Sequence, residues 1–536
     1  MTTALRVLLA TLVAMLLSTR SAHAVDPELV TQLGTGDVAG KVRAIEALTR
    51  SADPAGLTLL RAAQEGNLAV TPAGQVIIVE GEAVRDAATL QPIEPAPAEY
   101  ESVTLNNRVR GQLQSALSAF QLFAEDKAQR LAAAKALESS AQPSVLPILE
   151  KVLAGEPDPA VKAVLAQVKA GIDLGSGNPQ VRLAAVQVLG ESNVQRTKTL
   201  LYALLEKNSS GQYFEPDERV RKQAQLAISL IDRRLTVSEY AGRLFSGISL
   251  GSILLLAALG LAITYGLLGV INMAHGEMIM IGAYATYVTQ QAVRAYAPGW
   301  IEWYPLFAVP AAFAAAGLVG MALERGVIRW LYGRPLETLL ATWGISLFLI
   351  QLVRQVFGAQ NVEVSNPSWM SGGIELTNLT LPYNRIVIIF FALAVLVAMW
   401  LTLSRTRLGL FVRGVTQNRT MAACVGVPTA RVDLLAFGLG SGIAGLAGCA
   451  LAQVGNVGPD LGQGYIIDSF MVVVLGGVGQ LAGTVYAALG LGVASKFLEP
   501  HIGAVLTKIL VLVLIIAFIQ KRPQGLFALK GRAVEA

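Results

Sequence analysis

Residues 254–277 read LLLAALGLAITYGLLGVINMAHGE and join an apolar run to a group of polar side chains. Residues 244–276 contain no Asp, Glu, Lys or Arg, and a run of that length can cross the ~30 Å hydrocarbon core of a bilayer. The run ends at an amide, an imidazole and a carboxylate, on Asn272, His275 and Glu277. We therefore predict an integral membrane protein with polar groups close to the bilayer.

Further charge-free stretches follow toward the C-terminus. They cover residues 303–323, 386–404, 434–459 and 469–495. Shorter candidates are residues 278–293, 338–353 and 501–519. The number of crossings depends on whether residues 469–495 fold back at their glycines. We predict an all-α fold in which residues 236–536 form a polytopic transmembrane helical bundle of eight or nine spans.

Composition separates the chain into two parts. Of its 536 residues, 53% are hydrophobic and 15% are charged, whereas soluble domains are about a quarter charged. Residues 236–536 hold 18 Lys/Arg and 12 Asp/Glu, which leaves 24 and 25 for residues 1–235. The net charge of +5 therefore belongs to the membrane part and does not indicate a nucleic-acid partner. Two cysteines and three histidines without ligand spacing predict no metal site.

Residues 1–24 are typical of a secretory signal peptide. Arg6 precedes an apolar run over residues 7–17, and Ala22-His23-Ala24 supplies small residues for cleavage. A membrane anchor is the alternative, but about 11 apolar residues are too few to span the bilayer. The segment that follows, residues 25–235, should then be periplasmic.

The distribution of Lys and Arg gives an independent topology. Arginines concentrate in loops at residues 325–334 and 405–431, and the C-terminal tail is also basic. The alternate loops are poor in Lys and Arg, so the rich set should face the cytoplasm. This assignment places the C-terminus in the cytoplasm and residues 25–235 on the opposite side of a bacterial inner membrane.

Residues 25–235 contain recurring helical units. They are KVRAIEAL at 41–48, QRLAAAKAL at 129–137, QVRLAAVQVL at 180–189 and RVRKQAQLA at 219–227. Each follows an Asp, Asn or Pro helix-start signal and has apolar residues at a spacing of three to four. We predict a HEAT-like repeat domain, interrupted by a strand at QVIIVE, residues 75–80. Such a domain suits either docking of another exported protein or a purely stabilising extension.

Two segments rich in glycine and polar residues interrupt the apolar runs, GVINMAHGE at 269–277 and LGGVGQLAGT at 475–484. Irregular backbone at membrane depth persists only where protein or a wet cavity satisfies it, so we predict a solute pathway or gate. The alternative is a pair of short cytoplasmic turns, and for Asp468 an interfacial position is favoured over a deeper one. The candidate pathway residues are Asn272, His275, Glu277, Gln351, Gln480 and Asp468. The candidate gate or hinge glycines are Gly276, Gly476, Gly477, Gly479 and Gly483.

Residues 404–431 form the most distinctive polar segment of the membrane part. Five arginines surround TQNRTMAACVG at 416–426, a pattern compatible with a short helix lying beneath the membrane. The alternative is an ordinary basic cytoplasmic loop, although such a loop has no need of an alanine pair and glycines.

Together, GVINMAHGE, ERGVIRWLYGRP at 324–335, LGGVGQLAGT and RPQGLF at 522–527 resemble the branched-chain amino-acid type of ABC transporter permease. The resemblance covers residues 240–530. Within that family, FGAQNVEVSNPSWMSGG at 357–373 and LPYNR at 381–385 look most like the urea ABC transporter permease subunit. Some of those permeases also carry a long exported N-terminal extension.

The resemblance implies a type II-like ABC permease, the membrane-spanning subunit of an ATP-driven importer, with urea as the expected solute. Its expected partners are a second permease subunit, two cytoplasmic ABC ATPase subunits, a periplasmic solute-binding protein and membrane lipid. ATP would be bound by the ATPases, so no catalysis and no cofactor are expected in this chain.

The resemblance also implies that residues 404–431 are the coupling helix that docks in an ATPase groove. The residues that match are Arg413, Arg419, Ala422, Ala423 and Gly426. The segment departs from the common signature, because Met421 stands where Glu begins Glu-Ala-Ala, and two residues instead of three separate Ala423 from Gly426.

Three alternatives remain at this stage. The polar groups would equally pass a branched-chain amino acid or a short amide, since neither needs a fixed ion in the pathway. The chain could also be a passive urea or amide channel that needs no ATPase. Finally, the helical repeats could make it a membrane-anchored assembly platform.

Overall fold

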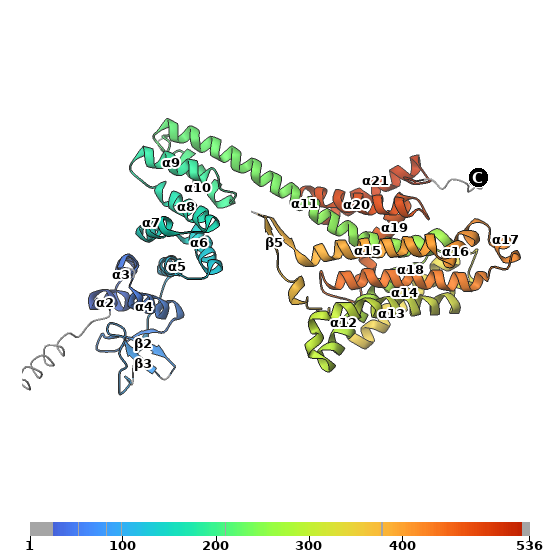
Figure 1. Ribbon diagram of the computed structural model, residues 1–536, viewed down its shortest axis with the longest axis horizontal. Coiled ribbons are helices and arrows are strands. Elements are labelled where there is room, and N and C mark those ends of the chain that lie inside the picture. The colour runs from blue at the N-terminus through green and yellow to red at the C-terminus, as the bar shows by residue number, and fades with distance from the viewer. Residues whose placement is uncertain are drawn as a thin grey trace, which may run out of the picture. The chain divides into compact units, whose positions relative to one another are not determined.

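The computed structural model describes residues 25–51, 53–81, 83–97, 99–209, 211–376 and 379–527, except for the side chains of residues 267 and 268. The predicted signal peptide lies outside the described residues. The chain forms two compact units, the N-terminal unit (residues 1–235) and the membrane unit (residues 236–536), each described by itself (Figure 1).

The N-terminal unit is mostly helical. Its helices begin at side chains that accept a backbone N–H, such as Asp53, Asp126, Asp158 and Asn178, as expected of N-caps. The helices are α2 (Pro27–Thr35), α3 (Val38–Ser51), α4 (Pro54–Glu65), α5 (Asn107–Gln121), α6 (Lys127–Ser140), η1 (Pro143–Val145), α7 (Leu146–Gly155), α8 (Pro159–Asp173), α9 (Pro179–Leu189) and α10 (Gln195–Leu205). A further helix, α11 (Glu218–Leu268), has residues in both units.

An arginine device recurs along the N-terminal unit. Arg130 and Arg182 each stand four residues after an N-cap and donate to a backbone carbonyl just before that cap. Each also forms a two-pronged ion pair with a buried glutamate, Arg130 with Glu156 and Arg182 with Glu215. The device ties the start of one helix to a later segment of the chain. It is compatible with the predicted repeats, while the HEAT-like label stays a prediction.

A small sheet corrects the expectation of an all-α fold. The antiparallel strands β1 (Leu68–Val70), β2 (Val76–Glu80), β3 (Ala83–Asp86) and β4 (Glu101–Ser102) lie in the order β3-β2-β1-β4. The strand predicted at residues 75–80 is therefore confirmed as β2. Its β-branched run, residues 76–79, favours a pleated and partly buried surface, which explains why a sheet forms here.

The membrane unit consists of long helices and short connecting elements. The long helices after α11 are α12 (His275–Tyr296), α13 (Tyr304–Gly326), α14 (Pro335–Phe357), α15 (Tyr383–Arg405), α18 (Thr429–Ala452), α19 (Leu461–Gly476), α20 (Leu481–Ile502) and α21 (Ala504–Lys521). The connecting elements are η2 (Pro298–Trp303), η3 (Ile328–Trp330), η4 (Ser368–Met370), the hairpin β5 (Gly373–Leu376) and β6 (Leu379–Pro382), and the helices α16 (Arg407–Gln417) and α17 (Arg419–Cys424).

Seven helices within the described residues are long and apolar enough to cross a membrane. They include parts of α11, α13, α14, α15, α18, α20 and α21. The remaining long helices are α12, which is not among the seven, and α19, which has only 16 residues. The predicted count of eight or nine crossings therefore stays a prediction. Residues 469–495 do fold back, since α19 ends at Gly476 and α20 begins at Leu481.

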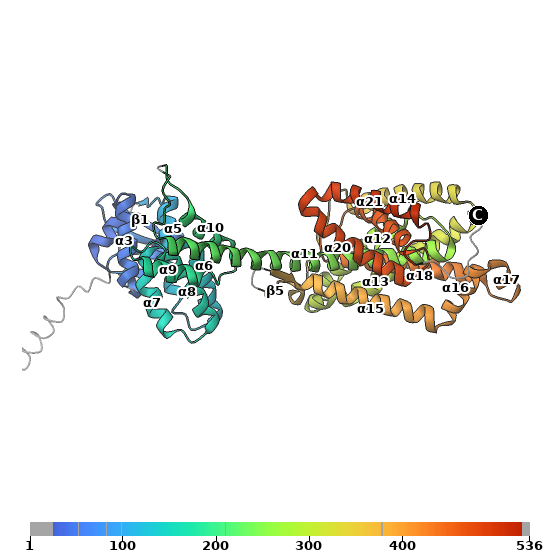
Figure 2. The same cartoon turned by 90° about the horizontal axis from the view of Figure 1, so that it is seen from above.

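Helix α18 lies at the centre of the membrane unit, beside α12 and α13 (Figures 1 and 2). Glycines allow this close approach, because a Cβ on Gly445 would lie 2.5 Å from the Ala312 carbonyl oxygen on α13. A Cβ on Gly448 would lie 1.9 Å from the Ile279 carbonyl oxygen on α12. Packing of small residues between membrane helices thus builds the bundle core.

Candidate functional site

The loop between α11 and α12 and the first turn of α12 carry three buried polar side chains. Asn272 Oδ1 accepts the Ala274 N–H at 3.0 Å, which holds the loop in shape. His275 Nε2 lies 3.0 Å from the carbonyl oxygen of Ala257 on α11. Glu277 Oε1 accepts a hydrogen bond from Ser346 Oγ on α14 at 2.8 Å. We call Asn272, His275 and Glu277 the polar loop site; each of these residues is at most 1% exposed.

Each residue of the polar loop site keeps one polar atom without a hydrogen-bond partner among the described residues. These atoms are Asn272 Nδ2, His275 Nδ1 and Glu277 Oε2. Leaving a buried polar group unpaired costs about 1–3 kcal/mol, so native proteins rarely keep several in one place. The unpaired atoms are an amide donor, a carboxylate acceptor and an imidazole nitrogen.

Helix α14 contributes residues that the sequence analysis did not select. Thr342 Oγ1 accepts the Met273 N–H at 3.1 Å, and Ser346 bonds Glu277 as described above. With Thr338 these hydroxyls recur every four residues and all three are buried. That spacing, visible within residues 338–353, was the signal that could have identified them.

Gly276 lies where the packing leaves no room for a side chain. A Cβ there would lie 2.6 Å from the carbonyl oxygen of Gly462 on α19, and a Cβ on Gly462 would lie 2.1 Å from the Gly276 carbonyl oxygen. The polar loop site is therefore pressed directly against the backbone of α19.

The other four predicted hinge glycines lie at the turn between α19 and α20 and have two different roles. Gly477 and Gly479 have φ angles of 101° and 83°, a region that favours glycine. Gly476 and Gly483 instead face each other, since a Cβ on Gly483 would lie 1.9 Å from the Gly476 carbonyl oxygen. The predicted hinge glycines thus include two that form the turn and two that form a tight contact between helices α19 and α20.

The turn approaches the end of α11, from which the polar loop departs. A Cβ on Gly266 would lie 2.7 Å from the Gly479 Cα. Gln480 is half-buried, and its backbone carbonyl accepts hydrogen bonds from the N–H and the hydroxyl of Thr484 at 3.0 Å each. The structure therefore brings the two segments, 269–277 and 475–484, to one end of the bundle.

The last described residues of the chain also hold this turn. The Leu526 N–H donates to the Leu475 carbonyl at 2.9 Å, and the Phe527 N–H donates to the Gly476 carbonyl at 3.3 Å. The Phe527 ring stacks on Tyr486 of α20 with centroids 5.7 Å apart. We call residues 525–527 the C-terminal strap.

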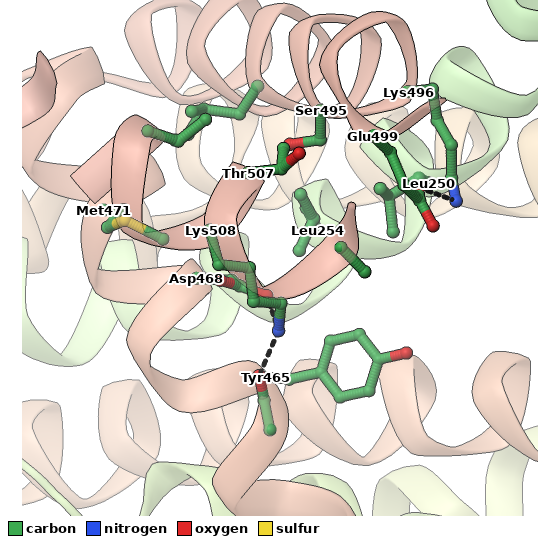
Figure 3. A pocket seen from close by; sticks show the side chains of 14 residues that line it. Leu250, Leu254, Tyr465, Asp468, Met471, Ser495, Lys496, Glu499, Thr507 and Lys508 are labelled. Atoms are coloured by element: carbon green, nitrogen blue, oxygen red, sulfur yellow. Dashed lines mark hydrogen bonds and ion pairs between the residues drawn. The ribbon is translucent and has the colours of Figure 1, made fainter. Parts of the chain in front are cut away.

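Gln351 and Asp468 do not join the polar loop site. The Gln351 side chain is exposed on α14. Asp468 pairs with Lys508 of α21 at 3.2 Å and lines a cavity of about 290 Å³ between α11, α19, α20 and α21 (Figure 3). A second ion pair in its wall joins Lys496 to Glu499 at 2.6 Å. The carboxylate of Asp468 thus has a partner cation.

Residues 404–431 form two short helices, α16 and α17. Arg419 is ion-paired with Asp433 and lies over the Tyr332 ring at 4.9 Å, while Arg413 donates to the Leu403 carbonyl. Burial raises the pKa of the Tyr332 hydroxyl, and the carboxylates of Asp433 and Glu324 raise it further. These two arginines therefore brace the segment against the ends of the neighbouring spans.

The tip of this segment is exposed. Ala422 is buried, whereas Ala423 is exposed, and Met421 and Val425 leave apolar side chains 59% and 75% exposed. Gly426 ends the tip with a φ of 87°, and the Val427 N–H closes the turn on the Ala422 carbonyl at 3.0 Å. A small, ordered apolar knob thus projects from the arginine-rich end.

Among the described residues, no group of three or more His, Cys, Asp or Glu side chains is placed to hold a metal ion.

Seven helices long and apolar enough to cross a membrane, packed into one unit, are the features of a multi-pass membrane protein. Residues 243–519 match the family described as "Branched-chain amino acid transport system / permease component". The chain belongs to this family, and the match covers the membrane unit from α11 to α21.

Individual relatives agree with this assignment. The chain is 30% identical over 301 residues to the high-affinity branched-chain amino acid transport system permease protein BraD of Pseudomonas aeruginosa, covering 54% of this chain and 96% of BraD. It is 28% identical over 295 residues to the corresponding permease protein LivH of Escherichia coli K12, covering 53% and 94%. The ribose import permease protein RbsC of E. coli K12 is 31% identical over 105 residues, which are 18% of this chain and 33% of RbsC. No solved structure matches.

Proposed function

We propose that the chain is the membrane-spanning permease subunit of an ATP-driven importer that moves a small polar solute, with urea as the first candidate, from the periplasm to the cytoplasm. The observation that carries the proposal is the polar loop site, with its unpaired donor and acceptor atoms inside a permease bundle. The importer class is supported by the family of the chain, and the solute by the chemistry of the site.

A neutral amide suits the unpaired atoms of the site. Urea offers a carbonyl acceptor for Asn272 Nδ2 and N–H donors for Glu277 Oε2, both of which lack partners among the described residues. The site holds no Lys or Arg that could pair with a solute carboxylate. Urea also needs little room, which suits a loop packed against the α19 backbone.

A branched-chain amino acid is the second candidate. The names of BraD and LivH state that those proteins belong to branched-chain amino acid transport systems. The Glu277 carboxylate could accept the ammonium group of such a solute. Transport without energy input, as in a passive amide channel, is the third candidate, and a platform formed by the N-terminal unit is the fourth.

The proposal assigns partners to the two faces of the membrane unit. The knob at Met421 and Val425 is the proposed contact for a cytoplasmic ATPase, because exposed apolar side chains on an ordered tip suit docking. A second permease subunit, a second ATPase and a periplasmic solute-binding protein complete the proposed importer. We place residues 25–235 in the periplasm and the C-terminus in the cytoplasm.

Uptake into vesicles tests the proposal. The chain is purified with its co-eluting subunits, reconstituted, and supplied with labelled urea or leucine, with ATP or with a non-hydrolysable analogue. We expect ATP-dependent accumulation of urea that excess leucine does not reduce. Accumulation of leucine alone would reject urea as the solute and retain the importer. Equal flux without ATP hydrolysis would reject the importer.

A further inference from the structure

The cavity between α11, α19, α20 and α21 carries charges of both signs in its wall (Figure 3). Lys508 of α21 pairs with Asp468 of α19, and Lys496 pairs with Glu499 within α20. Among the described residues, no other Lys, Arg, Asp or Glu lines it, so the formal charges of the wall cancel. We call it the ion-pair cavity. Its volume of about 290 Å³ is near the lower limit, roughly 300 Å³, of small-molecule sites.

Two charged groups of the ion-pair cavity are accessible and can form further hydrogen bonds. The side chains of Lys508 and Glu499 are 62% and 37% exposed, whereas that of Asp468 is only 15% exposed. The Lys508 ammonium has three N–H donors and directs two of them to Asp468 Oδ2 at 3.2 Å and the Gly464 carbonyl oxygen at 3.5 Å. Of the two Glu499 oxygens, Oε2 accepts from Lys496 at 2.6 Å. Lys508 and Glu499 therefore each have room for one more charged partner.

The charged part of the cavity lies near the ends of two helices that are long and apolar enough to cross a membrane. Lys496 and Glu499 are in the last two turns of α20, and Lys508 is in the first two turns of α21. Leu491 on α20 and Val511 on α21 line the cavity further from these ends. Along both spans the wall thus changes from charged at the membrane boundary to apolar toward the interior.

We propose that the ion-pair cavity binds the headgroup of a zwitterionic phospholipid with a primary ammonium, as in phosphatidylethanolamine. Lys508 binds the phosphate, and Glu499 accepts hydrogen bonds from the ammonium. The acyl chains leave the cavity on the side of Leu491 and Val511, toward the bilayer interior.

The charges of the wall select this headgroup. A wall whose charges cancel suits a ligand whose charges cancel, whereas an anionic headgroup would bring a third negative charge beside Asp468 and Glu499. The quaternary ammonium of phosphatidylcholine has no N–H to donate to Glu499. The order of charged and apolar wall along the spans is also that of a phospholipid, whose headgroup lies outside its chains.

Photo-crosslinking with three lipids tests this assignment without changing the protein. The full-length chain, with its co-purifying subunits, is reconstituted in phosphatidylglycerol vesicles. These contain a trace of phosphatidylethanolamine, phosphatidylcholine or phosphatidylglycerol, each with a diazirine near the ester end of one acyl chain. Peptide mass spectrometry then compares Tyr465 and Ser495, which line the cavity, with Phe390 and Leu393, which are exposed on α15.

We expect the phosphatidylethanolamine probe to label Tyr465 and Ser495 about tenfold more than the phosphatidylcholine probe, with equal labelling of α15. One hydrogen bond to a charged group corresponds to about that ratio. Equal labelling of the cavity by these two probes would overturn the proposal. Stronger labelling by the phosphatidylglycerol probe would also overturn it, since the site would then select an anion.

Free leucine distinguishes a lipid headgroup from a soluble zwitterion in the same cavity. Leucine carries a carboxylate and a primary ammonium but no acyl chains. Excess leucine should leave labelling of Tyr465 and Ser495 by the phosphatidylethanolamine probe unchanged. Loss of this labelling would assign the cavity to a soluble solute and overturn the proposal.

A glutamate variant tests the assigned acceptor. Glu499→Gln keeps the shape of the side chain and removes its charge, so labelling of the cavity by the phosphatidylethanolamine probe should fall about tenfold, to the level of the phosphatidylcholine probe. Glu337→Gln is the matched control, because Glu337 pairs with Arg334 at the same three-residue spacing and does not line the cavity. Wild-type labelling in Glu499→Gln would contradict the proposal.

Discussion

Asn272 has a structural role in the loop and, in our proposal, a second role in binding solute. Its Oδ1 shapes the loop through the Ala274 N–H, while its Nδ2 is the unpaired donor of the polar loop site. Substitutions that remove one atom at a time can separate these roles.

Asn272→Leu and Asn272→Asp should both reduce flux. The leucine loses both polar atoms, whereas the aspartate keeps the oxygen that accepts from Ala274 and loses only the NH2 group. If the NH2 group binds solute, one lost hydrogen bond reduces transport about fivefold or more in Asn272→Asp, with normal membrane insertion. Uptake in vesicles and the amount of inserted protein are the measurements. Wild-type uptake in Asn272→Leu would exclude this residue from the pathway.

The pair of Arg182 and Glu215 makes the stability of the N-terminal unit depend on pH. Burial opposes ionisation of Glu215, but the hydrogen bonds from Arg182 and the Asp217 N–H outweigh it and lower the pKa of Glu215 below 4.5. Stability from a lowered pKa is fully present above the ordinary value and is lost as the pH falls through the lowered one.

Glu215→Gln should therefore destabilise the N-terminal unit by about 3 kcal/mol at neutral pH, and by progressively less below pH 4.5. Hydrogen exchange of peptides from α9 in the full-length chain measures this difference. Glu150→Gln is the control, because Glu150 forms only an exposed pair with Lys169. A difference that does not change with pH would contradict the role of the ion pair.

At the scale of elements, the contact between α19 and α20 permits a matched glycine test. Gly483→Ala would bring a Cβ to 1.9 Å from a backbone oxygen, whereas Gly490→Ala on the same helix meets nothing within 4 Å. We expect Gly483→Ala to cost about 1–3 kcal/mol, and Gly490→Ala to be neutral or stabilising by about 0.5–1 kcal/mol. Thermal unfolding in detergent compares them. Equal melting temperatures would show that the two helices can separate at no cost.

The end of α17 permits a second element-scale test. Gly426→Pro removes an N–H that bonds the Ala423 carbonyl and cannot adopt the φ of 87°. It should abolish uptake and ATPase stimulation, while leaving membrane insertion intact. Gly426→Asn tolerates the left-handed conformation and should retain most activity. Normal ATPase stimulation in Gly426→Pro would contradict a coupling role for this segment.

The sequence predicted those elements whose signal is local. The charge-free runs correspond to helices of the membrane unit, and the β-branched run at 75–80 contains a strand, because length and side-chain type decide both. Which side of a lipid-exposed helix faces the core is harder to predict, since lipid and core are equally apolar. For this reason the sequence predicted Gln351 as a pathway residue. In the structure it lies outside the buried row of Thr338, Thr342 and Ser346 on the same helix.

Long-range contacts account for most of what the sequence could not predict in the site. No local pattern indicates that Gly276 meets Gly462 or that Glu277 meets Ser346, because each pair comes from separate helices. The sequence alone indicated segment 269–277, because polar side chains next to an apolar run cost free energy when they are buried in a membrane. The residues that contact this segment, such as Gly462 and Ser346, could be identified only from the packed helices.

At the scale of the whole molecule, each unit has a core built from its own residues. The largest core of the membrane unit draws on residues from Ile253 to Ile515. The first turns of α11 belong to the N-terminal unit, where Val220, Ala224 and Ile231 are buried. A cut after residue 235 therefore removes the hydrophobic clusters of the N-terminal unit and spares those of the membrane unit.

Removing residues 25–235, with residues 1–24 fused to residue 236, should leave membrane insertion and the thermal unfolding of the membrane unit unchanged. Uptake by this variant then distinguishes the two roles proposed for the N-terminal unit. Loss of uptake with intact insertion would indicate docking of a partner, and unchanged uptake would show that transport does not need the unit. Failure to insert would contradict independent folding of the membrane unit.

The C-terminal strap bears on how the protein is made. Leu526 and Phe527 complete the backbone hydrogen bonds of the turn at Leu475 and Gly476, about fifty residues upstream. During synthesis these donors leave the ribosome only after α20 and α21 have been translated. The turn can therefore reach its final form only after α20 and α21 have been made, and a chain that stopped between Lys521 and Leu526 would keep every helix of the described residues but leave this corner unfinished.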